Sequence, residues 1–374
     1  MRFLMLNWRD PHNPTAGGAE RVSLAHLAAL VRRGHDAYWF ANNFPGAGRA
    51  ETIEGVHIVR GGGLGTSIRH AIRWYRRQPP FDLVIDQHHG IPWYAPWWCR
   101  THCLAYIHEV LGPIWSVFYP RPLALLGRWQ ERWTHRLYRK VPFWTVSEST
   151  RKALLAHGVE RVVVFPNGIN TVALAALDDK PLAAPLRLVV VCRLAANKRV
   201  DHAIRVLPPL RVAGIDAQLT VVGSGEQQPQ LRALVDELRL TETVSFTGAV
   251  PEVEKDVHLR RAHFLLHTSV REGWGLNVIE ANAMGTPAVV YPVAGLVDST
   301  LHGQTGLVTP EETPEALAAS LVEAVRRPED YARLRHNAWQ RAKSLHWDHV
   351  LPATCAWLEE QARQPRRPAA LYFA

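Results

Sequence analysis

The chain alternates short apolar runs with longer amphipathic segments. Runs that fit buried strands cover residues 2–6, 36–40, 83–85, 103–107, 143–146 and 162–165. The amphipathic stretch 20–33 lies between the first two runs and predicts a helix that stops at Gly34, because glycine readily adopts the left-handed conformation found after helix ends. Such alternation of strand and helix predicts a doubly wound parallel sheet.

The same pattern restarts after a stretch rich in Ala, Asp and Pro at 174–185, which fits a linker. Further strands are predicted at 186–192, 217–222, 244–246, 264–267 and 288–291, with helices that end near 210 and 238. We therefore expect two Rossmann-like domains that face each other across a cleft, over 1–173 and 174–345. Residues 346–374 are expected to form a helix that crosses back to the first domain, followed by a poorly ordered tail from 364.

Composition narrows the class of protein. A length of 374 residues suits two domains, and a hydrophobic content of 47% excludes a mainly disordered chain. No apolar run approaches the ~20 residues that span a bilayer, and the N-terminus becomes polar too early for a signal peptide. The four cysteines lack paired zinc spacing. We therefore expect a cytoplasmic protein with free thiols.

Charge suggests one further partner. The net charge is +9 with only six lysines, and no nucleic-acid motif accompanies the many arginines, so we expect no nucleic-acid partner. Two segments place basic residues beside an apolar stripe at helical spacing: 69–77 and 128–140. Either they contact an anionic membrane surface, which would make the protein peripheral at the inner face of the membrane, or they are amphipathic helices packed on a sheet. Their basic residues are Arg69, Arg73, Arg76 and Arg77, then Arg128, Arg132, Arg136, Arg139 and Lys140.

The most informative motif runs from 271 to 281. Glu272 and Glu280 lie eight positions apart, with Gly273 and Gly275 between them. A helix that begins after Gly275 would aim its free N–H groups at a phosphate, and the two carboxylates could each bind a pair of hydroxyls. A nucleotide-sugar has this composition: a phosphate flanked by two diols. An ordinary strand–turn–helix connection with a solvated glutamate would give the same sequence pattern.

Other candidate residues follow predicted strands, where ligands of such sheets bind. His108 follows the run 103–107, and two cations, Arg193 and Lys198, follow the run 186–192. Gly17-Gly18 opens the first helix without the full Gly-x-Gly-x-x-Gly fingerprint, which argues against a dinucleotide enzyme. Further glycine-containing loops follow the next two strands, with Gly223, Gly225 and Gly248.

Taken in order along the chain, these motifs resemble the family-4 retaining glycosyltransferases of the GT-B fold. The resemblance is carried by Gly17-Gly18, His108-Glu109, 146–149, 166–168, Arg193 with Lys198, 222–225, 246–248, Glu272 to Glu280, Pro287 and 303–306. It implies an N-terminal acceptor-side domain, a C-terminal nucleotide-sugar donor domain, and transfer with retention and without a metal or other cofactor. No Asp-x-Asp metal motif is present.

The resemblance also implies residue roles. Arg193 and Lys198 would hold the donor diphosphate, Glu272 the hydroxyls of the transferred sugar, and His108 would contact the sugar near the reacting carbon; these four are the candidate catalytic residues. Glu280 would bind the ribose. The remaining candidate donor-binding residues are Gly17, Gly18, Gly223, Gly225, Gly248, Val250, Gly273, Trp274, Gly275, Leu276 and Asn277.

Three positions depart from the family pattern: Cys192 stands where glycine is usual, Asp298 where glutamate is usual and Trp274 where phenylalanine is commoner. We predict a glycosyltransferase that uses a UDP- or GDP-linked sugar and a lipid-linked or cell-envelope glycan acceptor. The alternatives are a GT-B transferase with a soluble small-molecule or glucan acceptor, and a non-catalytic nucleotide-sugar-binding subunit.

Overall fold

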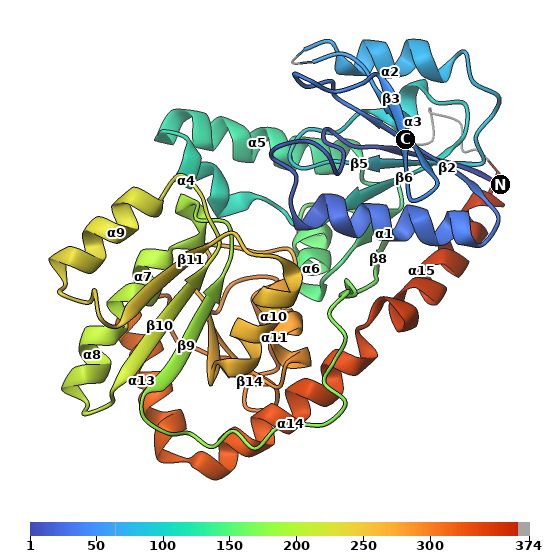
Figure 1. Cartoon of the computed structure of the whole chain (residues 1–374). Helices are drawn as coiled ribbons and strands as arrows, with labels where there is room; N and C mark the ends of the chain where they lie inside the picture. Colours follow the sequence, from blue (N-terminus) through green and yellow to red (C-terminus); the bar gives the residue numbers. More distant parts are fainter. Residues whose placement is uncertain (64, 366–374) are drawn as a thin grey trace. The chain divides into compact units, whose positions relative to one another are not determined.

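A computed structural model describes residues 1–63 and 65–365 (Figure 1). The chain forms two compact units. The first comprises residues 1–115 and 119–168 and takes up the chain again from Trp347; the second comprises 116–118 and 169–346. Ile169 groups with the second unit because its amide N–H donates to Leu345 O at 3.0 Å. The tail predicted to be poorly ordered lies almost wholly outside the described residues.

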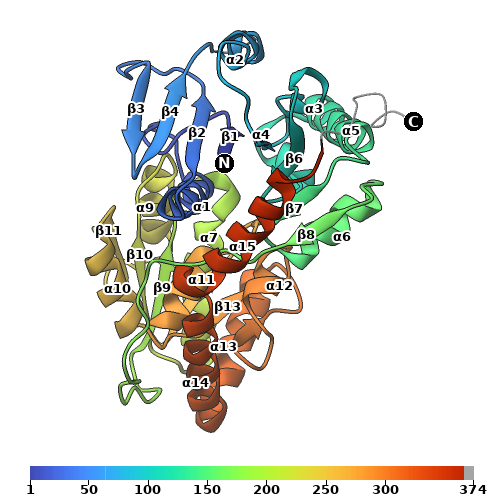
Figure 2. The same cartoon turned by 90° about the vertical axis from the view of Figure 1, so that its right-hand side faces the viewer.

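The first unit is built on one eight-stranded sheet in the order β3-β4-β2-β1-β5-β6-β7-β8. Figure 2 shows β3 and β4 at one end of it and β7 and β8 at the other. All neighbouring strands are parallel except β3 and β4, which form an antiparallel hairpin. The strands are β1 (Arg2–Leu6), β2 (Asp36–Ala41), β3 (Ala50–Ile53), β4 (Val56–Arg60), β5 (Leu83–Gln87), β6 (His102–Ile107), β7 (Phe143–Thr145) and β8 (Val162–Val164).

Helices cover this sheet because the central strands are apolar on both faces; in β5, for example, every residue is buried. Helix α15 packs beside α1, as Figure 2 shows. The helices are α1 (Gly18–Arg32), α2 (Ser67–Tyr75), α3 (Ala95–Trp98), α5 (Arg121–Leu137), α6 (Glu148–Ala156) and α15 (Trp347–Ala362), with a 3-10 turn at Gly112–Ile114 and the short α4 (Trp115–Phe118) after it.

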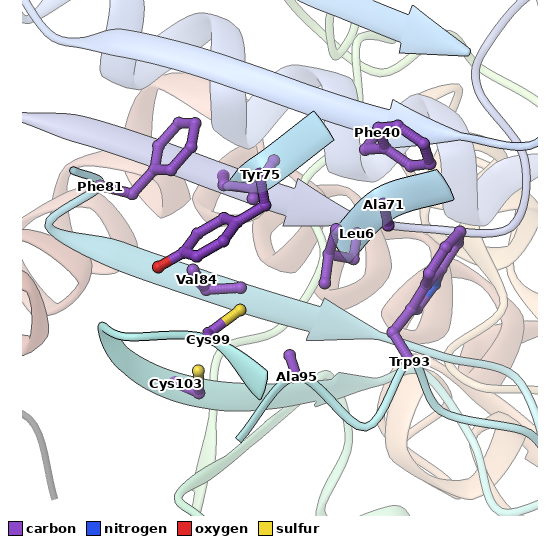
Figure 3. Packing of buried hydrophobic residues seen from close by; sticks show 11 residues of the cluster. Leu6, Phe40, Ala71, Tyr75, Phe81, Val84, Trp93, Ala95, Cys99 and Cys103 are labelled. Atoms are coloured by element: carbon purple, nitrogen blue, oxygen red, sulfur yellow. The ribbon is translucent and has the colours of Figure 1, made fainter. Parts of the chain in front are cut away.

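An aromatic cluster forms part of the core of the first unit (Figure 3). Phe40, Tyr75, Phe81 and Trp93 pack there around the smaller side chains of the sheet and of α2. Cys99 and Cys103 lie in the same cluster as free thiols and act as small apolar side chains.

The second unit repeats the architecture with a six-stranded, fully parallel sheet in the order β11-β10-β9-β12-β13-β14. Figure 1 shows α7, α8 and α9 on one face and α10 and α11 on the other. The strands are β9 (Leu186–Val191), β10 (Ala217–Val222), β11 (Val244–Gly248), β12 (Phe264–His267), β13 (Ala288–Val290) and β14 (Gly306–Val308). The helices are α7 (Val200–Arg205), α8 (Leu207–Val212), α9 (Gln228–Glu237), α10 (Glu252–Arg261), α11 (Leu276–Ala283), α12 (Leu296–Ser299), α13 (Pro314–Arg326) and α14 (Pro328–Ser344), with a 3-10 turn at Ala196–Lys198.

The predicted fold class, two doubly wound parallel-sheet α/β units, is confirmed. The hairpin of β3 and β4 and the edge strand β14 were absent from the prediction. Among the described residues, no helix is both long and apolar enough to cross a bilayer.

The two basic segments differ in the structure. Segment 69–77 forms α2 and the turn after it. The apolar side of α2 packs into the core, where Ala71 and Tyr75 are buried. For α2 the structure therefore favours the alternative of an ordinary amphipathic helix. Segment 128–140 lies on α5 and the residues that follow it, and there Leu126, Trp129 and Trp133 remain exposed.

Candidate active site

The paired-glutamate motif forms a loop and helix at the carboxyl edge of the second sheet. Strand β12 ends at His267, and α11 begins at Leu276, directly after Gly275 as predicted. Gly275 has φ +93°, a left-handed conformation that side chains rarely adopt, so glycine lets the loop turn into the helix. The backbone N–H groups at the start of α11 therefore point toward the loop that carries Glu272, while Glu280 lies one turn inside the helix.

Glu272 is the centre of a buried polar cluster. Lys198 Nζ forms an ion pair with Glu272 Oε1, and Ser269 Oγ donates to the same oxygen at 2.9 Å. His267 Nε2 lies 3.6 Å from it. Burial acts to raise the pKa of the Glu272 carboxyl, but Lys198, His267 and the hydrogen bonds together lower it, so this group is an anion at neutral pH. Burial lowers the pKa of His267 to about 4, which keeps that ring neutral.

Glu280 has its own buried cation. Lys255 of α10 is 8% exposed, and its Nζ lies 3.0 Å from Glu280 Oε2. Burial would lower the pKa of Lys255, but the charges of Glu280 and Glu252 raise it overall, so the ammonium persists. The Glu280 carboxylate is thereby held at a fixed place on the helix.

The ends of β9 and β10 meet Glu272 and Lys198 at the same edge. Cys192 N donates to Val222 O at 3.1 Å, and Leu194 N to Ser224 O at 2.9 Å, so the loops after the two strands are tied together. Arg193 lies in this paired region as an exposed side chain, without an ion pair among the residues that the structure describes. Burial raises the pKa of the Cys192 thiol to about 12, so the residue that replaces the usual glycine is a neutral thiol.

The glycines after β10 are required by backbone packing. A Cβ on Gly223 would lie 1.9 Å from Cys192 O, and one on Gly225 would lie 2.4 Å from Leu194 O. Gly223 also has φ +131°. Any side chain at Gly223 would therefore push apart the loop that carries Arg193.

The remaining candidates of the second unit join the same edge. Gly223 N donates to Gly248 O at 2.8 Å, which places the end of β11, and Val250 shortly after it, beside the end of β10. Asn277 Nδ2 donates to Val191 O at 2.8 Å, which fixes the start of α11 to the end of β9. Trp274 is only 7% exposed and Arg341 lies over its ring, so we expect it to contribute its backbone rather than its side chain to a ligand. Gly273 precedes it in the same loop.

In the first unit, Gly17 and Gly18 begin α1 after a loop held by ion pairs. Glu20 accepts a hydrogen bond from Gly17 N at 2.7 Å and pairs with Arg9 at 3.0 Å, so the Gly17 amide is already satisfied. This leaves Gly18, the first residue of α1, as the better candidate of the two for contact with a phosphate.

His108 directly follows β6 at the carboxyl edge of the first sheet. Its Nε2 lies 3.1 Å from Gln87 Nε2, at the end of β5, and Thr150 Oγ1 donates to its backbone carbonyl at 3.2 Å. Burial, with a smaller contribution from His89, lowers the pKa of His108 to about 3. The ring is therefore neutral at physiological pH.

Each unit thus gathers its own candidates at the carboxyl edge of its own sheet. The second unit brings together Arg193, Lys198, Glu272 and Glu280 with the glycine loops, and the first brings Gly17, Gly18 and His108. Sequence reasoning missed the partners of these groups: His267, Ser269, Lys255 and Gln87. His267, Ser269 and Gln87 lie at or just after the ends of strands, which was an available signal; for Lys255 there was none, because its contact with Glu280 joins two helices.

Two family models match the chain. A family model described as Glycosyltransferase Family 4 matches residues 16–172, and one described as Glycosyl transferases group 1 matches residues 180–341. The chain belongs to the family-4 glycosyltransferases. The match to the first model contains Gly17, Gly18 and His108, and the match to the second contains every candidate of the second unit.

Relatives of this glycosyltransferase differ in what they act on. A glycogen synthase of Mycobacterium tuberculosis is 26% identical over 98% of both chains. A GDP-mannose-dependent phosphatidylinositol monomannoside mannosyltransferase of Mycolicibacterium smegmatis is 32% identical over 46% of this chain and 44% of its own.

Solved structures show the GT-B fold. Sucrose-phosphate synthase from Thermosynechococcus elongatus superposes with a TM-score of 0.78 at 19% identity, covering 96% of this chain and 99% of its own. HepE from Anabaena, solved with UDP-glucose, gives a TM-score of 0.71 at 17% identity over 96% of this chain and 100% of its own. This glycosyltransferase therefore has the GT-B fold.

Proposed function

We propose that the protein is a retaining, metal-independent glycosyltransferase that moves a sugar from a UDP- or GDP-linked donor to a lipid-linked or cell-envelope glycan. The observation that carries the donor half of the proposal is the arrangement around α11. A cation and a carboxylate, Lys198 and Glu272, lie before the helix N-terminus, and a second carboxylate, Glu280, lies one turn inside it. This arrangement supports the proposal, because charges of both signs and the backbone N–H groups at a helix start are the groups that bind a sugar diphosphate.

The roles follow from charge and position. Arg193 and Lys198 bind the diphosphate and stabilise the negative charge that develops as the nucleotide leaves. Glu272 accepts hydrogen bonds from the hydroxyls of the transferred sugar, and Glu280, held by Lys255, accepts those of the ribose. Because Arg193 and Lys198 supply two cations to neutralise the leaving group, the proposed reaction needs no divalent metal.

The other candidates surround these groups. Backbone N–H groups of 273–276 bind the sugar and phosphate, while Gly223, Gly225, Gly248 and Val250 line the place of the base. In the first unit, Gly18 contacts phosphate, and the neutral ring of His108 forms a hydrogen bond with the sugar near its reacting carbon. Retention is proposed from family membership, and the anomeric configuration of the product tests it.

Donor binding requires the Lys198–Glu272 ion pair to be exchanged. In the ligand-free arrangement each group satisfies the other. When the donor binds, diphosphate oxygens replace Glu272 on Lys198, and sugar hydroxyls replace Lys198 on Glu272. The two side chains are 21% and 17% exposed. Breaking the pair without replacement leaves two part-buried charges uncompensated, so a ligand that supplies both groups makes the exchange favourable.

One structural neighbour and one sequence relative support the choice of donor class. The HepE structure contains UDP-glucose, and the mycobacterial mannosyltransferase relative uses GDP-mannose. Free thiols, with Cys99, Cys103 and Cys355 buried, fit a reducing compartment such as the cytoplasm, where we propose that the protein acts.

Helix α5 supports the choice of a lipid-linked acceptor. Leu125, Leu126, Trp129 and Trp133 follow one face of the helix, and Trp129 is 63% exposed. Basic side chains flank this face, and the one acidic residue of the helix, Glu131, is buried and accepts hydrogen bonds from two backbone amides. An apolar stripe bordered by cations fits the interface of an anionic membrane.

A hollow of about 560 Å³ lies beside this face. Trp133, Arg136 and Arg139 of the α5 segment line it, together with His157 after α6. Its cations could bind the phosphate of a lipid headgroup while the apolar face enters the acyl boundary. A membrane-bound acceptor also agrees with the mannosyltransferase relative, which is named for a phosphatidylinositol mannoside.

A soluble acceptor is the second candidate. The glycogen synthase relative matches the chain over its whole length, and the sucrose-phosphate synthase structure has the same fold. The third candidate, a non-catalytic nucleotide-sugar-binding subunit, would bind donor without turning it over.

Calorimetry with UDP, GDP, ADP and dTDP in the presence of EDTA tests the donor half. We expect one nucleotide class to bind, Glu280→Ala to weaken that binding, and Glu272→Ala to spare the free nucleotide while abolishing turnover. Glu323→Ala, an exposed glutamate of α13, serves as the matched control. Binding of none of the four nucleotides, or equal loss in both variants, would contradict the assignment; binding without donor hydrolysis or transfer would favour the binding subunit.

Sedimentation with liposomes tests the acceptor half. We expect binding to anionic but not to neutral vesicles, lost in the double variant Trp129→Ser/Trp133→Ser and retained in Val253→Ser, an exposed apolar residue of α10. A protein that ignores anionic vesicles and transfers only to soluble sugars would support the glucan-type alternative instead.

A further inference from the structure

Two polar side chains, Ser23 and Gln87, form a row behind His108 in the first unit. Ser23 of α1 and Gln87 at the end of β5 are buried, and Ser23 Oγ lies 2.7 Å from Gln87 Oε1. Gln87 Nε2 lies 3.1 Å from His108 Nε2. Three elements that are far apart in the sequence thus converge on one imidazole.

The chemistry of the amide decides the state of this ring. An amide nitrogen donates hydrogen bonds and does not accept them, so His108 Nε2 must be the acceptor and the ring proton sits on Nδ1. An imidazolium would present an N–H at Nε2 and would oppose the N–H of Gln87. The amide therefore excludes the cation as well as the other neutral tautomer.

The surroundings of His108 reinforce the neutral form. His26 of α1 and His89 after β5 are the charged or titratable neighbours that oppose a proton on it, and Tyr106 stacks nearby at 4.6 Å between ring centroids. Glu109, the nearest acidic side chain along the chain, lies 4.0 Å from His89 Nε2. Burial lowers the pKa values of His26 and His108 to about 3, so these two rings are neutral together.

We propose that Gln87 is a positioning residue that holds the His108 ring with its proton on Nδ1, and that Ser23 orients the Gln87 amide for this task. This inference rests on the proposed contact between His108 and the sugar. In that contact the His108 ring is a fixed, neutral hydrogen-bond donor to the sugar. His108 therefore transfers no proton in the reaction. Ser23 Oγ also lies 2.9 Å from Ala19 O, but a hydroxyl has a single proton, and it is donation to Gln87 Oε1 that orients the amide.

Substitutions at Gln87 distinguish a residue that positions the His108 ring from one that only stabilises the fold. Gln87→Glu replaces the donor by a carboxylate, which can only accept, so the His108 proton should move to Nε2 and the pKa of the ring should rise. Gln87→Leu removes the bond while keeping the volume close, and should leave the ring in a mixture of tautomers. Gln218→Glu, at an exposed position of β10, adds the same charge as a control.

Nitrogen-15 NMR of the full chain with labelled histidine measures the tautomer directly, and the His108→Asn variant identifies the signal. We expect the wild type to show a proton on Nδ1 and no titration between pH 5 and 8, and Gln87→Glu to show the proton on Nε2 with titration at higher pH. A wild-type proton on Nε2, or unchanged signals in Gln87→Glu, would overturn the proposal. Because the NMR measurement needs no turnover, it tests the tautomer of His108 even if the proposed function is wrong.

Kinetics add a second readout. Misplacement of a contacting group by about 1 Å can cost up to ~100-fold in rate, so Gln87→Leu should lower kcat by about 10- to 100-fold. The affinity for free nucleotide, which binds in the second unit, should stay within about twofold. Ser23→Ala should show a smaller loss of kcat in the same direction. A Gln87→Leu protein with wild-type melting temperature and wild-type kcat would refute the positioning role.

Discussion

The Lys255–Glu280 pair offers the sharpest test of how the donor site is built. We predict that Lys255→Met weakens nucleotide binding although Lys255 is not expected to contact the nucleotide. Lys255 Nζ lies 3.0 Å from Glu280 Oε2, and the two side chains are 8% and 12% exposed. At an effective dielectric constant of about 20, two charges at this separation attract by roughly 5 kcal/mol before the cost of desolvation.

Desolvation reduces the net effect of the pair, but loss of one partner leaves the other charge buried and uncompensated. Such a loss typically costs about 3–5 kcal/mol, and partial solvent access to Glu280 places our expectation near 2–3 kcal/mol of stability. The carboxylate would turn toward water or take up a proton, and either change removes it from the ribose. We expect about a tenfold or greater increase in the nucleotide Kd, since 1.4 kcal/mol corresponds to a factor of ten.

A double-mutant cycle of Lys255 and Glu280, measured by calorimetry of nucleotide binding, tests whether Lys255 acts through Glu280. If Lys255 acts through Glu280, Lys255→Met should add almost nothing in a Glu280→Gln background, and the two effects should be strongly non-additive. Lys343→Met, a substitution of a lysine on α14, is the control for loss of positive charge. Additive losses, or a Lys255→Met protein with normal affinity, would refute the view that the ion pair sets the position of Glu280.

Three further predictions concern the framework. Gly223→Ala should abolish nucleotide binding or destabilise the fold by more than about 2 kcal/mol, since its Cβ would lie 1.9 Å from Cys192 O; normal affinity and melting temperature would contradict this. Asp86→Ala should cost about 3–5 kcal/mol in denaturant unfolding, because this buried carboxylate accepts from two backbone amides and a tyrosine hydroxyl; a loss below 1 kcal/mol would count against it. The Arg33 guanidinium lowers the pKa of Glu359 to about 2, so the stability from this carboxylate is present above its unfolded pKa near 4.5 and is lost as pH falls toward 2. Glu359→Gln should therefore flatten the acid side of a melting-temperature profile between pH 5 and 2, and an unchanged profile would exclude this contribution.

The sequence predicted most of the sheets because their strands are buried on both faces and so appear as unbroken apolar runs. It missed the hairpin of β3 and β4, where Ile53 pairs with Val56 around a two-residue turn. Glu54 and Gly55 both have positive φ there, the geometry usually signalled by Asn-Gly or Asp-Gly. Because glutamate occupies the first turn position, the sequence lacks this usual signal for a two-residue turn. The edge strand β14 begins with Gly306 and is only partly buried, so it has no clear apolar run.

The candidate site was predictable to the extent that its groups follow strand ends. Parallel strands bring their carboxyl ends to one edge, so Lys198 and Glu272 could be expected to share an edge although 74 positions separate them. Their direct pairing was not predictable, because it depends on side-chain rotamers. No spacing rule predicts Lys255, since its contact with Glu280 joins two helices and forms only when the unit has folded.

The return of the chain to its first unit has a practical consequence. Helix α15 packs on α1, and the Trp347 ring lies so near Gly168 that a Cβ there would approach it to 2.4 Å. A fragment that stops at Gly168 would lack α15, whose residues Val350, Leu351 and Leu358 are buried, and would leave the side of α1 that packs against this helix uncovered. The first unit is therefore discontinuous in the gene, and separate production of it requires the C-terminal helix to be supplied, either fused after Gly168 through a short link or added as a second chain.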